Sequence, residues 1–596
     1  MIKRHCPYII IIVINLLVLT GLLLHYLNAT YPNIGHDYRY FIPRLIDTYL
    51  HYKVNGLTIQ WYTPSFGGGI PAYPNPQHLQ FSLTQLLTGL VDPWSAILIS
   101  TASYLFIGFM AAWYVFRRYL HFGMPASILG AVFWIANGFY FQHMAVGHVT
   151  FQPFPILAVI VAVLLHPRLP VWLAGVLIAF LTTLLIYSGS FYLIVIFLFS
   201  LAVFLPLVYF IKPDLVSLRR LLKIGIVGVG LAALMCASKL GAINSFLQAF
   251  PRTASDAYPV SIISALVGVA VQLTGTMTLA PFLAAIGKSP MVLVVRLSQW
   301  SGSPYSFWEL DTSISPVLWI LIVAFLGSAI FRVKSIRFPR ISRKQLLAVG
   351  ILVFTIYCLF EYILARGLIY SYLHGLPFMQ SLRVNSRMTA ALIFPLAVLG
   401  ALIFDRWMNH LYTATRQWGA FLVTNGLAMV SVGGMFLLPM EVQMRNFEMP
   451  VALTAFTVSQ QTDETFPVEQ ISPNMNEWEV FQGRSSSLRL YEPLFDADYH
   501  PVLQAGSVYL EQDGYFNMNH PAGFVYPREN DTAPFERIPV SERLQLEDFV
   551  NRRQPDWILP AWQVGLNWAS AISVLASTIL LTGWTLWRAW KKRQNN

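Results

Sequence analysis

Charge is scarce in this chain. Only 11% of its 596 residues are charged, and its mean hydropathy is +0.56. Soluble globular proteins carry about 25% charged residues, so the composition excludes an ordinary soluble enzyme. Apolar runs near the ~20 residues that cross a bilayer recur along the sequence. The sequence therefore predicts an all-α polytopic membrane protein.

Cysteine is scarce as well, and a nucleotide-binding loop is lacking. The three cysteines, Cys6, Cys236 and Cys358, all fall in apolar runs. Neither a disulfide framework nor a zinc site of cysteines is therefore supported. The glycine-rich stretch "SFGGGIP" has no following Lys-Ser/Thr and no following helix, which excludes a P-loop.

Basic residues exceed acidic ones, and their positions explain why. A net charge of +11 would suit nucleic acid, but 21 of the 39 Lys and Arg fall in segments that we place in the cytoplasm. These segments hold Lys3/Arg4, Arg117/Arg118, Arg168, Lys212 to Lys223, Arg332 to Lys344, Arg406/Arg416 and Arg588 to Arg593. This is the positive-inside distribution. It argues against a nucleic-acid partner and predicts a multi-pass protein of a bacterial inner or plasma membrane, with both termini cytoplasmic.

Hydropathy predicts about twelve spans. They cover residues 7–27, 95–116, 125–142, 152–166, 171–187, 190–211, 223–240, 314–331, 346–364, 388–405, 418–438 and 566–587. The first run follows a basic start but has no small-residue cleavage site after it, so we interpret it as an uncleaved helix rather than a signal peptide.

The composition changes near residue 440. Residues 441–562 hold 19 of the 28 acidic residues. Short β-like runs and the helical stretch "SERLQLEDFVNRR" predict a small extracytoplasmic α+β domain there. The predicted domains are a transmembrane domain with external loops over 1–438, the polar domain over 439–565, and a last helix with a basic cytoplasmic tail over 566–596.

Acidic residues are rare in the membrane part, and none falls in the middle of a predicted span. Asp92 is typical of a helix start. Six acids lie on the outer side: Asp37, Asp47, Asp256, Glu309, Asp311 and Glu361. An ion-coupled transporter usually needs ionisable or broken-helix sites near the midplane. This placement instead favours an enzyme that acts at the outer surface on a lipid-carried substrate.

Asp37 lies in the first outer segment, shortly after the first apolar run, in "GHDYRYF". A carboxylate there can take the proton of an acceptor hydroxyl. Arg383 and Arg387, in "LRVNSR", are four apart and would share a helix face, where two guanidinium groups suit a phosphate. Lys239 and Arg252 are further candidates for the phosphate side. Candidates for substrate contact are His36, Arg39, His143, His148, Glu309 and Asp311.

Each candidate has a structural alternative. Asp37 could cap a helix or pair with Arg39 or Arg44, and Asp47 fits a solvated helix face. The histidines could be satisfied by backbone groups. Glu309 and Asp311 could cap the following helix, and the two arginines could be interface anchors.

An Asp right after the first helix resembles the GT-C glycosyltransferases. The run "GHDYRYF…NGLTIQWYTPSFGGGIPAYPNPQ" is similar to the first loop of the YfhO-like bacterial membrane proteins. "MAVGH", "AFPRTASD", "FWELDTSISP" and "LRVNSR" follow in the order of that branch, over about residues 1–410. The resemblance implies a GT-C-like fold and Asp37 as general base. No acidic pair adjoins Asp37, so no metal ligand is assigned and a divalent metal is left open.

The resemblance implies transfer of a hexosyl or pentosyl group from a polyprenyl-phosphate sugar to an acceptor hydroxyl. The acceptor would be a cell-surface glycan, a lipid or a protein at the outer face of the bilayer. The alternatives are a transporter or lipid flippase, and a non-catalytic assembly protein of the same fold.

Overall fold

The computed structural model describes residues 37–249, 261–288, 307–331, 342–411, 417–433, 449–487 and 543–594, with short gaps at 68, 377–378, 381, 473–475 and 557. In the first predicted span it describes only isolated positions. His36, Arg252 and Asp256 lie outside the described residues.

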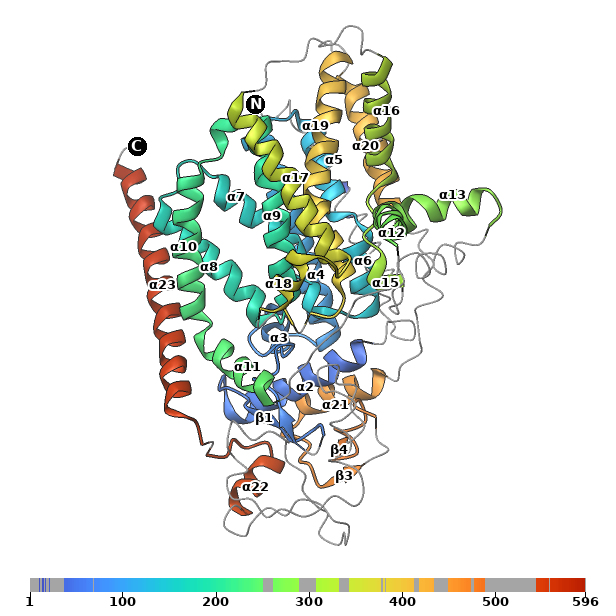
Figure 1. Ribbon diagram of the computed structural model, residues 1–596. Helices are drawn as coiled ribbons and strands as arrows, with labels where there is room; N and C mark the ends of the chain where they lie inside the picture. Colours follow the sequence, from blue (N-terminus) through green and yellow to red (C-terminus); the bar gives the residue numbers. More distant parts are fainter. Residues whose placement is uncertain are drawn as a thin grey trace.

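Apolar helices form one bundle (Figure 1). In the described part of the chain, five helical segments are long and apolar enough to cross a membrane: Pro93–Tyr119, Phe191–Ile211, Arg343–Ile363, Asn385–Asn409 and Ala561–Lys591. They correspond to α4 (Pro93–Tyr114), α9 (Phe191–Ile211), α17 (Arg343–Ile363), α19 (Ile393–Leu411) and α23 (Ala561–Gln594). A sixth is a pair bent by 70°, which joins α10 (Leu218–Met235) to α11 (Ala237–Ala249).

Shorter apolar helices complete the bundle. They are α5 (Met124–Ile135), α7 (Leu157–Leu165), α8 (Val171–Tyr187), α16 (Pro316–Phe331) and α20 (Gln417–Gly433). Each predicted span after the first overlaps one or two of these apolar helical segments over its described residues. The count of twelve spans stays a prediction, because most of the shorter helices are below the length that crosses a bilayer alone.

The predicted span over 125–142 is divided into two helices. After α5 ends, Asn137 caps α6 (Gly138–Val146), and its side chain accepts a hydrogen bond from the Tyr140 amide at 2.9 Å. Asp92 caps α4 in the same way and accepts from the amides of Trp94 and Ser95, as the sequence predicts.

The elements predicted to lie outside the membrane, called the outer elements below, gather at one end of the bundle (Figure 1). The first loop forms α2 (Tyr38–Asn55), the antiparallel strands β1 (Tyr62–Thr63) and β2 (Ile70–Pro71), and α3 (Leu83–Leu87). The later polar region contributes α21 (Met449–Gln461), the parallel strands β3 (Gln470–Ser472) and β4 (Ser485–Ser487), and α22 (Arg543–Val550). Its described part is thus a mixture of helix and strand, and it packs on the first loop. The domain boundaries stay predictions.

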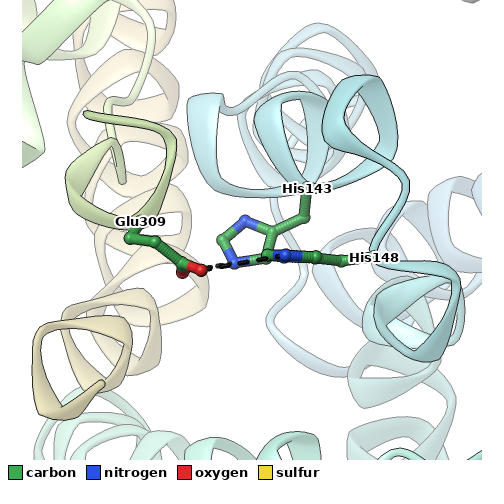
Figure 2. A group of neighbouring side chains, drawn as sticks. All are labelled: His143, His148 and Glu309. Atoms are coloured by element: carbon green, nitrogen blue, oxygen red, sulfur yellow. Dashed lines mark ion pairs between the residues drawn. The ribbon is translucent and has the colours of Figure 1, made fainter. Parts of the chain in front are cut away.

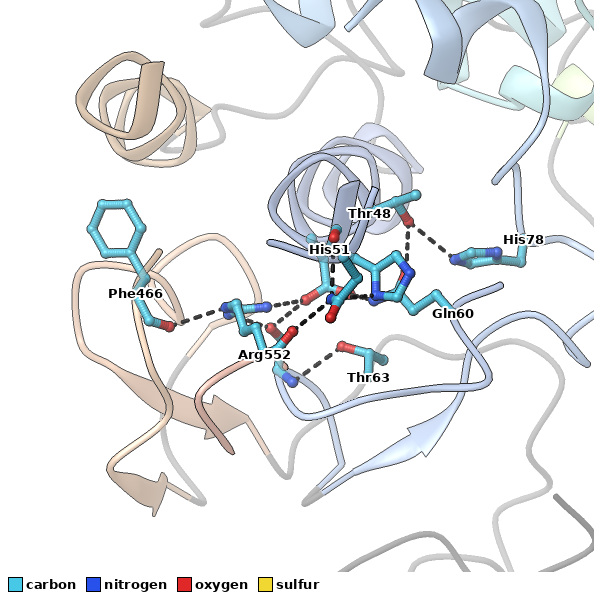
Figure 3. Close-up of polar contacts among 10 residues, drawn as sticks. Thr48, His51, Gln60, Thr63, His78, Phe466 and Arg552 are labelled. Carbon is cyan, nitrogen blue, oxygen red and sulfur yellow. Dashed lines mark hydrogen bonds and ion pairs between the residues drawn. The ribbon is translucent and has the colours of Figure 1, made fainter. Parts of the chain in front are cut away.

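A buried ion pair joins these two outer regions. Arg552, just after α22, donates to Asp47 of α2 at 2.6 Å, and both side chains are almost fully buried. Ser65 and Gln60 of the first loop donate to the same carboxylate. Figure 3 shows Arg552 of the later region beside Gln60 of the first loop. The interpretation of Asp47 as part of a solvated face is therefore wrong. Its helix face is covered by chain that lies some 500 residues downstream, which helix periodicity does not reveal.

Candidate active site

The start of α2 is fixed against the end of α6. The Asp37 amide donates to the Val146 carbonyl at 3.0 Å, and the Tyr38 hydroxyl donates to the Met144 carbonyl at 2.5 Å. Gly147 ends α6 with a φ of +102°, and a Cβ there would lie 2.5 Å from the Tyr38 nitrogen. Glycine adopts this backbone conformation without strain and has no Cβ to clash with Tyr38. The tight turn at Gly147 places the next residue beside Asp37.

That next residue is His148. Its Nε2 lies 2.6 Å from Oδ2 of Asp37, so the ring N–H donates to the carboxylate. The Asp37 side chain makes no capping hydrogen bond on α2, although the residue is at the N-cap position. Asp37 and His148 therefore form a carboxylate–imidazole pair at the wall of a cavity.

Glu309 approaches the pair from the opposite side. It belongs to the short α15 (Phe307–Leu310), which packs on α6 and on the 3₁₀ segment η7 (Asn385–Leu392). Arg387 donates two hydrogen bonds, of 2.5 and 2.6 Å, to the Glu309 carboxylate. Burial opposes the ionisation of Glu309, but Arg387, His148 and His143 outweigh burial and hold the pKa of this carboxyl well below its usual range. Glu309 is therefore an anion.

His143 completes the group. Its Nε2 lies 3.5 Å from Oε2 of Glu309, and Nε2 of His148 lies 3.8 Å from Oε1 (Figure 2). Nδ1 of His143 donates to the Phe139 carbonyl at 2.8 Å. Burial lowers the pKa of His143 to about 4, so the ring is neutral at pH 7. Among the described residues, His143, His148 and Glu309 are grouped closely enough to hold a metal ion.

A cavity of about 840 Å³ opens beside these residues. Asp37, His148, Glu309, Arg383 and Arg387 lie at its polar end. Most of the remaining wall is apolar and comes from α7 to α11. The cavity thus offers charge at one end and a long apolar surface at the other.

Some residues of the apolar wall are accessible. Leu198 of α9 and Val229 of α10 line the cavity and are 62% and 66% exposed. An apolar chain can therefore contact this part of the wall.

The two predicted phosphate-binding arginines both line the cavity, but not from one helix face. Arg383 lies in an extended segment before η7, and its amide donates to the Tyr192 hydroxyl at 2.7 Å. The guanidinium of Arg387 lies 4.7 Å from the Tyr192 ring centroid and 5.1 Å from that of Phe151. The expectation of a shared helix face is wrong, because the helix begins only after Arg383.

The remaining candidates lie in other surroundings. Lys239 is buried, and its ammonium donates to the carbonyls of Tyr73 and Asn75 in the first loop. Arg39 pairs with the buried Glu477 of the outer region at 3.2 Å. Asp311 accepts from the Gln142 amide and from the backbone of Ser313.

Tyr192, Phe151 and Gly147 are parts of the site that the sequence did not predict. Aromatic residues form 14% of the chain, so neither ring stands out by type. Gly147 had a visible signal, since it separates a helical stretch from His148 in "MAVGH".

No protein-family model and no curated protein matches this chain. Among solved structures, it is similar to ArnT from Cupriavidus metallidurans bound to undecaprenyl phosphate. The identity is 13% and the TM-score 0.40, with 80% of this chain and 85% of ArnT covered. It is also similar to the arabinofuranosyltransferase AftD from mycobacteria, at 12% identity and a TM-score of 0.36. That likeness covers 74% of this chain and 30% of AftD. Likeness at these TM-scores leaves the chemistry to be argued from the residues of the site.

Proposed function

We propose that this protein is an integral-membrane glycosyltransferase that moves a sugar from a polyprenyl-phosphate donor to an acceptor hydroxyl, with Asp37 as general base. The observation that carries the proposal is the cavity. It has Asp37, His148, Arg383 and Arg387 at its polar end and exposed apolar wall residues on α9 and α10. An occupant with an anionic head and a long apolar tail fits this distribution of charge.

The reaction is a single displacement at the anomeric carbon. The acceptor oxygen forms its bond to that carbon as the bond from the carbon to the phosphate oxygen breaks. Asp37 takes the acceptor proton, and the polyprenyl phosphate leaves with the electron pair. One base is sufficient, and the configuration of the sugar inverts.

The neighbours of Asp37 have separate roles. His148 donates to Oδ2 and so fixes the carboxylate in one orientation. Arg383 and Arg387 place positive charge where the leaving phosphate develops negative charge. Glu309 holds the Arg387 guanidinium in place by its two hydrogen bonds.

Asp37→Asn tests the assignment. An amide cannot accept the proton, so transfer from a radiolabelled polyprenyl-phosphate sugar is expected to fall about 10²–10⁴-fold. The variant is expected to keep the wild-type melting temperature, because the amide oxygen still accepts from His148. Wild-type turnover in Asp37→Asn would remove Asp37 from the reaction.

A cavity with a polar end and a long apolar wall also fits a lipid translocator. The same preparation separates the two functions, since a translocator moves a labelled lipid across a vesicle membrane without forming a glycosidic bond. Translocation without product would favour the second function.

A further inference from the structure

The C-terminal end of α23 lies opposite to the outer elements, at the other end of the bundle (Figure 1). Near this end the guanidinium carbon of Arg588 lies 4.3 Å from the ring centroid of Trp584. Trp584 packs edge-on against Trp172, the second residue of α8, with the ring centroids 6.4 Å apart. The two rings therefore bring Arg588 close to the start of α8.

A second arginine reaches the start of α8 from α10. Nη2 of Arg220 donates to the carbonyls of His166 and Leu169, at 2.8 and 2.9 Å. Both carbonyls belong to the connection between α7 and α8. Arg168 lies in the same connection, where its amide donates to Nδ1 of His166 at 3.2 Å. The positive charges of Arg168, Arg220 and Arg588 all interact with the His166 ring, so the three form one arginine cluster built from separate segments.

The arginine cluster has no carboxylate partner in the part of the chain that the structure describes. None of its three members belongs to an ion pair there. Asp214, the acid nearest to Arg220 in the sequence, is exposed and does not pair with it. Like charges held close together repel one another. An anion bound among the arginines removes this repulsion, and guanidinium groups suit a phosphate in particular.

The surroundings of the cluster indicate which kind of phosphate fits. Trp172 is 40% exposed, and tryptophan is enriched where a bilayer meets water. Beyond Lys223, the exposed side chains of α10 are apolar, and Ile226 is 73% exposed. A ligand with a phosphate at one end and apolar chains at the other matches this order of cations, interfacial rings and apolar surface.

We propose that Arg168, Arg220 and Arg588 bind the head group of an anionic phospholipid in the membrane leaflet at this end of the bundle. The guanidinium groups donate to the phosphate oxygens, and the acyl chains lie beside the apolar part of α10. Basic pockets between membrane helices select anionic lipids in this way, whereas a zwitterionic lipid brings an ammonium group of its own. The bound lipid links the α7–α8 connection, α10 and α23. Asp37 has no part in this site, so the inference does not depend on the proposed transfer.

The test uses the full-length protein in detergent, with phosphatidylglycerol, phosphatidylcholine or inorganic phosphate added. A ligand that binds only the folded state stabilises it. Phosphatidylglycerol is therefore expected to raise the melting temperature to a plateau as its concentration rises, and to stay bound in native mass spectrometry. The other two additives are expected to leave the melting temperature unchanged. An equal shift with phosphatidylcholine or with inorganic phosphate, or no shift with phosphatidylglycerol, would overturn the proposal.

Single substitutions locate the lipid. Arg168→Gln, Arg220→Gln and Arg588→Gln are each expected to weaken phosphatidylglycerol binding about fivefold, the usual effect of one arginine near an anionic head group. Arg343→Gln is the matched control, because Arg343 is an exposed arginine at the start of α17, outside the cluster. This variant is expected to bind the lipid as the wild type does.

Arg220→Gln also loses two hydrogen bonds to backbone carbonyls. If that variant fails to fold, Arg168→Gln and Arg588→Gln decide, since neither of these guanidinium groups makes a hydrogen bond among the described residues. If they weaken binding no more than Arg343→Gln does, the lipid is attracted by the general positive charge of the protein, and the proposed site is wrong.

Discussion

Arg387 contacts two kinds of neighbour at the polar end of the cavity. It pairs with the buried Glu309, and its guanidinium lies against the rings of Tyr192 and Phe151. Removing one partner of a buried ion pair leaves the other charge uncompensated, which costs about 3–5 kcal/mol. Arg387→Met is therefore expected to lower the free energy of unfolding by about that amount, measured by chemical denaturation in detergent.

A double variant shows whether the stranded charge is the cause. Arg387→Met combined with Glu309→Gln is expected to be more stable than Arg387→Met alone, because no anion is then left without a cation. Arg484→Met is the control, since the pairs of Arg484 with Glu464 and Glu469 are largely exposed and such pairs contribute about 0–1 kcal/mol. If the changes in the free energy of unfolding caused by Arg387→Met and Glu309→Gln simply add in the double variant, this account of the site is contradicted.

At the scale of elements, the local composition of the sequence predicts where apolar helices lie, but it does not predict where one helix is interrupted and the next begins. The predicted span 171–187 coincides with α8, and 190–211 differs from α9 by one residue, because a run of apolar residues is a local property. The break before α6 depends on Asn137 and on contacts with the segment that precedes α16, including the pairing of Asn137 with Ile314. No periodicity in either segment shows that pairing.

The ion pair between Asp47 and Arg552 holds the turn after α22 against α2, the helix whose N-cap residue is Asp37. Arg552→Ala leaves a buried carboxylate and is expected to destabilise this contact by about 3–5 kcal/mol. Amide hydrogen exchange over residues 543–556 is expected to accelerate while exchange in α8 and α9 stays unchanged. Arg553→Ala, next in sequence, removes only an exposed pair with Asp548 and is expected to leave exchange at the wild-type rate. Equal acceleration in both variants would show that the buried pair does not fasten the outer region.

At the scale of the whole molecule, the members of the site could be named from the sequence but their arrangement could not. Asp37, His148, Glu309 and Arg387 were all candidates, because charged and imidazole groups are conspicuous at the ends of apolar runs. Their convergence depends on the packing of four separate segments, which one sequence does not encode in any visible pattern. Lys239 shows the converse, since its type suggested phosphate binding while its ammonium holds the first loop.

The accessible wall residues of α9 and α10 give the last prediction, which is that the lipid donor enters between these helices. Val229 lies on the cavity wall and is 66% exposed, so Val229→Trp adds a bulky ring on the proposed path. Leu234, on the same helix and 51% exposed, is not part of the wall and lies on the opposite helix face from Gly225, so Leu234→Trp is the control.

Transfer from a long-chain polyprenyl-phosphate sugar is expected to fall at least tenfold in Val229→Trp only. A short-chain, water-soluble donor needs no passage from the bilayer, so both variants are expected to use it equally. If Val229→Trp uses the long-chain donor as the wild type does, the lipid reaches Asp37 by another path than the one between α9 and α10.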